Sequence, residues 1–273
     1  MFNMPDLQIF DSLTHPTPEG TWLDSRYDHL CSAEALRRQM DEADIRQLLA
    51  VGMGESVGGY REARYADWVR TSIPGALPVA YCDPSVFPSS GPELRARCRS
   101  LRDAGYVGIK LHPRLGGFTF ENESLADLIQ TADETGLFSM ICTYNYGKGL
   151  DLDRLSLGRL TKLLNSLDDP RVILLHGGTV AALEWAEAVR MWPNVLLDLS
   201  FTILRFKGSS LDADLRFLFR TFDERICVGS DHPQFSLVEL RRRVQEFAQA
   251  TTPDKLAKIA YRNLDRFVTE SSR

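Results

Sequence analysis

The chain has 273 residues, of which 44% are hydrophobic and 25% are charged, so it is long enough to bury a large core. Its net charge is −5 and its longest basic run is Arg241-Arg242-Arg243, which argues against nucleic acid as a partner; no apolar stretch approaches the roughly 18 residues that span a membrane. The five cysteines are scattered without CxxC spacing and no signal peptide is apparent, so we expect a cytoplasmic protein with reduced thiols and a small-molecule substrate, with a homo-oligomer left open.

Short apolar runs alternate with amphipathic stretches along the whole chain. The runs predict strands at residues 7–10, 45–51, 77–81, 107–111, 137–142, 172–175, 195–199 and 226–228. The stretches between and after them predict helices at 33–44, 60–71, 92–104, 124–135, 153–167, 180–191, 211–222 and 237–250. A ninth helix is predicted at 253–268, and Ser32, Ser236 and Thr252 are candidate N-caps.

Strict alternation of strand and helix indicates parallel strands joined by helical crossovers. An open, doubly wound sheet would show the same pattern, but no GxGxxG or GxxxxGK[ST] motif follows any strand. The count of eight strand–helix pairs favours closure of the sheet into a barrel. We therefore predict an α/β fold, a (β/α)₈ TIM barrel that occupies residues 1–273 as one domain with an extra C-terminal helix.

Active-site groups of such a barrel come from the carboxyl ends of its strands and the loops that follow. After the first strand, Asp11, Leu13 and His15 alternate onto one face. The fourth strand ends with Lys110 and His112 on a shared face.

Three further strands also end in reactive groups. Cys142 closes the fifth strand and precedes Tyr144, His176 closes the sixth, and Asp231 follows the eighth. A single histidine at a strand end is more often structural than catalytic, and a buried thiol such as Cys142 is more often inert. Lys110 differs, because an ammonium between apolar strand residues needs water, a partner or a ligand.

Several segments carry a family resemblance that covers nearly the whole chain. The segments are IFDSLTHP, GIKLHP, ETGLFSMICT, VILLHGG, WPNVLLDLS and ICVGSDHP with the terminal IAYRNLDRF. They resemble the amidohydrolase-related family of TIM-barrel, metal-dependent hydrolases and decarboxylases. Its members normally carry His-x-His on strand one, a histidine after strand five, a histidine on strand six and an aspartate on strand eight.

This chain matches the family's site residues at three positions and departs from them at two. His15, His176 and Asp231 match the second strand-one histidine, the strand-six histidine and the strand-eight aspartate. Leu13 stands where the first histidine is expected, and Cys142, or Thr143 if the register slips by one, stands at the strand-five position.

These departures leave a metal site with fewer ligands than the family normally has. The resemblance implies His15, Asp231 and Cys142 as ligands, with His112 as an alternative to Cys142; a carboxylated Lys110 as in dinuclear relatives is a further option. Catalytic zinc usually takes three protein ligands and a water. We therefore expect either no cofactor or one divalent metal such as zinc in a degenerate site.

Some lactonases of the wider family work without a metal, and the residues present fit that chemistry. Asp231 would be the general base, Lys110 and His112 would stabilise the oxyanion, and His176 would protonate the leaving group. For substrate binding, the candidates are the cationic Arg114 and Arg205 and the aromatic Tyr144 and Tyr146; a plain surface role is the alternative for all four.

The resemblance and the strand-end residues together imply an enzyme. We expect an amidohydrolase-type hydrolase that cleaves a lactone, amide or similar carbonyl-type bond in a small polar or acidic molecule. Non-oxidative decarboxylation is the second hypothesis. A catalytically silent barrel that binds a ligand is the third, since loss of two metal-site histidines is also what decay of an active site would produce.

Overall fold

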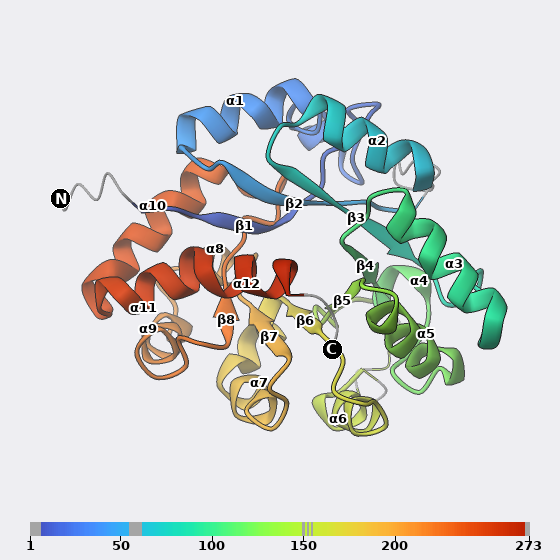
Figure 1. Ribbon diagram of the computed structural model, residues 1–273. Helices are drawn as coiled ribbons and strands as arrows, with labels where there is room; N and C mark the ends of the chain where they lie inside the picture. Colours follow the sequence, from blue (N-terminus) through green and yellow to red (C-terminus); the bar gives the residue numbers. More distant parts are fainter. Residues whose placement is uncertain (1–6, 55–61, 149–150, 152, 154, 271–273) are drawn as a thin grey trace.

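Eight parallel strands form the centre of the molecule, and helices surround them (Figure 1). The computed structural model describes residues 7–54, 62–148, 151, 153 and 155–270. Consecutive strands pair in parallel from first to eighth, which confirms the predicted TIM barrel. The strands are β1 (Phe10–Thr14), β2 (Gln47–Val51), β3 (Ala76–Cys82), β4 (Gly108–Leu111), β5 (Phe138–Cys142), β6 (Val172–Leu175), β7 (Val195–Asp198) and β8 (Ile226–Cys227).

Helices follow the strands in the predicted alternation. They are α1 (Ala33–Ala43), α2 (Glu62–Ser72), α3 (Gly91–Asp103), α4 (Pro113–Gly116), α5 (Glu123–Glu134), α6 (Leu157–Asn165), α7 (Ala182–Val189), α8 (Thr202–Arg205), α9 (Leu211–Thr221), α10 (Leu237–Phe247), α11 (Pro253–Ala257) and α12 (Asn263–Thr269). The hydroxyls of Ser32, Ser236 and Thr252 cap α1, α10 and α11 as predicted.

The first strand lies further along the chain than the predicted range of 7–10. The structure places it at Phe10–Thr14, and every residue in it is buried. The prediction ended the strand before the polar residues Asp11, Ser12 and Thr14. These residues are hydrogen-bonded inside the barrel, so the strand continues through them. The pairing of β1 with β2 is irregular between Asp11 and Thr14, and Leu13 therefore joins Phe10 in the interior cluster three residues away.

Every predicted helix has a counterpart among the described residues, but the bounds and the number of helices differ. The predicted helix at 60–71 begins outside the described residues and ends at Ser72 as α2. The helix predicted at 153–167 shortens to α6, which begins at Leu157; part of the predicted first turn lies outside the described residues. The single extra helix is α11 and α12 joined by the π-helical turn Lys258–Arg262, and two short helices after β4 and β7 were not predicted.

The core has two parts, one between strands and helices and one inside the barrel. The interior cluster includes Phe10, Leu13 and Phe138 from the strands and Leu264 and Phe267 from α12. Phe267 meets the ring of Phe138 edge-on, with ring centroids 5.6 Å apart. In Figure 1, α12 lies across the strands, so it closes the end of the barrel from which the strands start.

Two further features of the fold concern the thiols and the helix lengths. All five cysteines are buried and free of disulfides. Within the described ranges, the helices are too short or too polar for any of them to cross a bilayer.

Close packing at Gly108 provides a test of the barrel interior. A Cβ atom at this position would lie 2.5 Å from the Phe138 ring and 2.8 Å from its backbone oxygen, and the oxygen cannot move away without breaking the sheet. We expect Gly108→Ala to lower the free energy of unfolding by about 1–3 kcal/mol in denaturant titrations. Gly158→Ala in α6, where the nearest neighbouring atom is 4.0 Å away, is the matched control and should be neutral or stabilising; equal effects would contradict the packing.

Candidate active site

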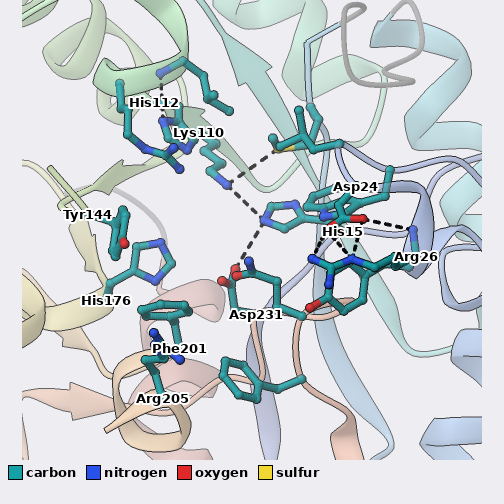
Figure 2. A pocket seen from close by; sticks show the side chains of 18 residues that line it. His15, Asp24, Arg26, Lys110, His112, Tyr144, His176, Phe201, Arg205 and Asp231 are labelled. Carbon is teal, nitrogen blue, oxygen red and sulfur yellow. Dashed lines mark hydrogen bonds and ion pairs between the residues drawn. The ribbon is translucent and has the colours of Figure 1, made fainter. Parts of the chain in front are cut away.

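A cavity of about 530 Å³ opens at the carboxyl ends of the strands. Figure 2 shows its side chains converging from strands and loops far apart in the sequence. Eight residues predicted from the sequence line it: His15, Lys110, His112, Arg114, Tyr144, His176, Arg205 and Asp231.

Lys110 and His15 meet near the middle of this cavity (Figure 2). Lys110 Nζ lies 3.1 Å from His15 Nε2 and 3.8 Å from Met53 Sδ. His15 Nδ1 lies 2.8 Å from the backbone oxygen of Val51; because a carbonyl oxygen only accepts, Nδ1 carries the ring proton. His15 Nε2 therefore holds the lone pair and accepts from Lys110. Burial and the charge of Lys110 lower the pKa of His15 well below its ordinary value, so the ring is neutral.

Asp231 lies on the other side of His15. Its Oδ1 is 3.7 Å from His15 Nε2, and since His15 is neutral this contact is not an ion pair. Its backbone adopts a φ of 59°, a conformation that strains a residue with a side chain and is found most often at functional positions. Burial raises the pKa of Asp231, although His176 and Lys110 partly oppose the shift. A raised pKa is what a carboxylate needs to act as a base near neutral pH.

His176 is held by a buried network that the sequence analysis missed. His176 Nδ1 lies 3.3 Å from both the carbonyl oxygen and the hydroxyl of Ser200. Asp198, at the end of β7, accepts hydrogen bonds from the hydroxyls of Ser12 and Ser200 and from the backbone N–H of His176. Asp198 is therefore a positioning residue that fixes Ser200 and, through it, the ring of His176. Its place at a strand end was the signal that could have revealed it.

Cys142 connects two of the histidines. Its thiol is buried, hydrogen-bonds with His112 and His176, and is not part of the cavity lining. His112 Nδ1 accepts the backbone N–H of Leu115 at 3.3 Å, so the ring proton is on Nε2, the nitrogen left to face Cys142. Burial lowers the pKa of His112, and its ring is neutral.

Charge within this cluster favours a thiolate beside an imidazolium. Burial alone would raise the pKa of Cys142, but His112 and His176 outweigh it and lower that pKa well below its usual value. Burial likewise opposes protonation of His176, but Cys142, Asp231 and Asp198 bring the pKa of His176 to about 9. His176 is therefore protonated at neutral pH.

Two arginines at the cavity have no acidic partner among the described residues. Arg114 stacks its guanidinium over the Tyr144 ring, 5.2 Å from the centroid, and its buried Nε has no hydrogen-bond partner within the described chain. Arg205 lines the cavity from the end of α8. Both are free to bind an anionic group.

The aromatic wall differs from the prediction in part. Tyr146 is 43% exposed, packs edge-on against Tyr144 and is not among the residues that line the cavity. Phe201, missed from the sequence, lies between Tyr144 and Phe235 with centroids 5.2 and 5.9 Å away. Trp22 stacks on His15 at 5.3 Å.

The implied metal ligands His15, Asp231 and Cys142 do not fit a metal centre. Across the described ranges, no three His, Cys, Asp or Glu side chains are grouped closely enough to hold an ion. The His15 lone pair that an ion would need already accepts from Lys110, Cys142 is engaged with His112 and His176, and Leu13 packs inside the barrel. The predicted ligand set is therefore not assembled.

Comparisons with known proteins agree with the fold. The model of the family described as Amidohydrolase matches residues 10–267. An uncharacterised TIM-barrel protein from Bordetella bronchiseptica superposes with a TM-score of 0.81 at 19% identity, covering 98% of this chain and 100% of that one. A search of curated proteins gives no match.

The similar structures with functional names include a hydrolase and decarboxylases. A probable 2-pyrone-4,6-dicarboxylic acid hydrolase from Acinetobacter baumannii, with citric acid bound, has a TM-score of 0.69 at 13% identity and covers 96% of this chain and 100% of that one. 5-Carboxyvanillate decarboxylase from Sphingomonas paucimobilis has a TM-score of 0.64 at 14% identity, with coverages of 96% and 99%. At these identities the likeness concerns the fold alone.

The ring contacts predict distinct states for three histidines. In ¹⁵N NMR spectra near neutral pH, we expect His15 as the Nδ1–H tautomer, His112 as the Nε2–H tautomer and His176 with both nitrogens protonated. His176 should lose its proton near pH 9. Because this pKa is raised from 6.5, the stabilisation from the charged ring is complete below pH 6.5 and is lost as the pH rises through about 9. Reversed tautomers at His15 and His112 would contradict the assignment.

Proposed function

Since the chain belongs to the amidohydrolase family, we propose that it hydrolyses a lactone, amide or similar carbonyl-type bond in a small acidic or polar molecule. The observation that carries the proposal is the grouping of Lys110, Asp231 and His176 around one cavity. These side chains supply a hydrogen-bond donor, a carboxylate and an acid to a single bound molecule.

Asp231 is the proposed general base. Its carboxylate takes a proton from a water molecule, whose oxygen attacks the substrate carbonyl. Lys110 donates an N–H to the oxygen that gains negative charge, because Nζ points into the cavity beside His15. His176, protonated at neutral pH, gives a proton to the departing oxygen or nitrogen as the bond to the carbonyl carbon breaks.

His112 has a different part from the one expected. Its Nδ1 accepts from Leu115 and its remaining N–H faces Cys142, so no ring proton is left for the substrate oxygen. We therefore assign oxyanion stabilisation to Lys110 alone. His112 instead positions Cys142, which in turn contacts His176.

The free arginines favour an anionic substrate. Arg114 and Arg205 both line the cavity without acidic partners in the described chain, and each offers a planar fork that matches a carboxylate. The dicarboxylic acid in the name of the Acinetobacter relative supports an acidic substrate here as well.

Decarboxylation is the second candidate, favoured by the decarboxylases among the similar structures and by the protonated His176. In that reaction an arginine-bound carboxylate leaves as CO₂ and His176 protonates the carbon that keeps the electron pair. Isotopes separate the two reactions: hydrolysis in H₂¹⁸O places ¹⁸O in the product carboxylate, whereas decarboxylation in D₂O places deuterium on carbon. Ligand binding without turnover of lactones, amides and carboxylic acids would instead support the silent barrel.

Substitutions of the base and the oxyanion donor test the proposed roles. With a substrate identified by screening lactones and amides of small acids, we expect Asp231→Asn to lower kcat by about 10²–10⁴-fold. Lys110→Met should lower kcat by about 10²–10³-fold. Asp127→Asn and Lys162→Met, at exposed positions on α5 and α6, are the matched controls. Full activity in both site variants would overturn the assignment.

Arg114 allows a separate test of substrate charge. We expect Arg114→Met to raise KM for an acidic substrate by about 10–100-fold, because it removes a hydrogen bond to a charged group. The KM of the corresponding neutral amide or ester should change little. An equal rise in KM for both would show that Arg114 shapes the pocket without recognising the carboxylate.

A further inference from the structure

We propose that the side-chain nitrogen of Lys110 takes the position of a catalytic metal ion and closes the site to divalent cations. Its catalytic meaning rests on the proposed function, whereas the exclusion of metals concerns the residues alone. The observations behind it are the contacts of Lys110 Nζ with His15 and Met53 and the position of Asp231 beside the same His15 nitrogen.

His15 has one atom to offer a metal, and Lys110 engages it. Val51 O binds the proton on His15 Nδ1, so the ring cannot turn its other nitrogen toward the cavity without losing this buried hydrogen bond. The lone pair on Nε2 accepts from Lys110 Nζ at 3.1 Å. An ion bound to His15 would have to displace Lys110 from a position where its side chain is buried.

Asp231 lies against the same ring nitrogen from the other side. Its Oδ1 is 3.7 Å from His15 Nε2, whose lone pair already accepts from Lys110 Nζ. A divalent ion shared by His15 and Asp231 would therefore need the lone pair that Lys110 engages. Leu13 and Cys142 supply no replacement ligands, since the first packs inside the barrel and the second hydrogen-bonds with two histidines.

The consequence for the reaction is that Lys110 polarises the substrate carbonyl as a bound metal would. An N–H donor does this by hydrogen bonding to the oxygen, with no coordination bond to form or break. The base and the electrophile then lie on either side of His15, whose Nε2 holds Lys110 through their hydrogen bond.

Metal binding tests the proposal without any substrate. Wild-type protein dialysed against zinc should retain less than about a tenth of an equivalent by elemental analysis. Lys110→Met should bind Co²⁺ at least about tenfold more tightly than wild type, the factor that one altered neighbour of a metal typically brings. The gain should vanish in the double variant Lys110→Met/His15→Gln.

Trp22 provides the readout, because its ring stacks on His15 and paramagnetic Co²⁺ bound there quenches its fluorescence. Trp22→Phe identifies the signal, and thermal melting confirms that each variant is folded. One equivalent of zinc held by wild type, or equal Co²⁺ affinity of wild type and folded Lys110→Met, overturns the proposal. Failure to find any hydrolysed substrate would count against the proposed function and would leave these metal measurements intact.

Discussion

The seam between β8 and β1 is the constraint on which the site depends. β8 has only two residues, so closure relies on backbone bonds beyond it: Asp231 N donates to Leu13 O at 3.0 Å and His15 N to His232 O at 2.9 Å. The Asp11 carboxylate adds a bond from Ser230 N at 2.9 Å. Because His15 and Asp231 stand on opposite sides of this seam, its register sets their 3.7 Å separation.

Neighbouring backbone groups, more than side-chain identity, decide what each histidine can do. Val51 O makes His15 an acceptor toward the cavity, while the N–H of Leu115 makes His112 a donor toward Cys142. The two rings therefore have opposite tautomers although both lie at strand ends. His176 differs again, since Cys142, Asp231 and Asp198 outweigh burial and favour its charged form. Three histidines at strand ends thus differ in protonation because their neighbours differ.

The eight-strand barrel was predictable because strand and helix periods alternate without interruption, and His15, Lys110 and Asp231 were predictable because chemistry collects at strand ends. The start of β1 was missed, since hydrogen-bonded polar residues fill a strand that is buried on both faces. Asp198 was missed because its partners Ser12 and Ser200 come from another strand and a loop. Tautomers and the Lys110–His15 contact depend on distances between β1 and β4, which periodicity does not encode.

The proposed role of Lys110 places an amine beside His15 and Asp231, where the family resemblance implies a metal ion. The most direct measurement is a crystal structure of the wild-type protein grown in excess zinc, with data collected at the zinc absorption edge. We expect Lys110 Nζ within hydrogen-bond distance of His15 Nε2 and no anomalous peak between His15 and Asp231. A zinc ion bound by those two residues, with Lys110 turned away, would contradict it.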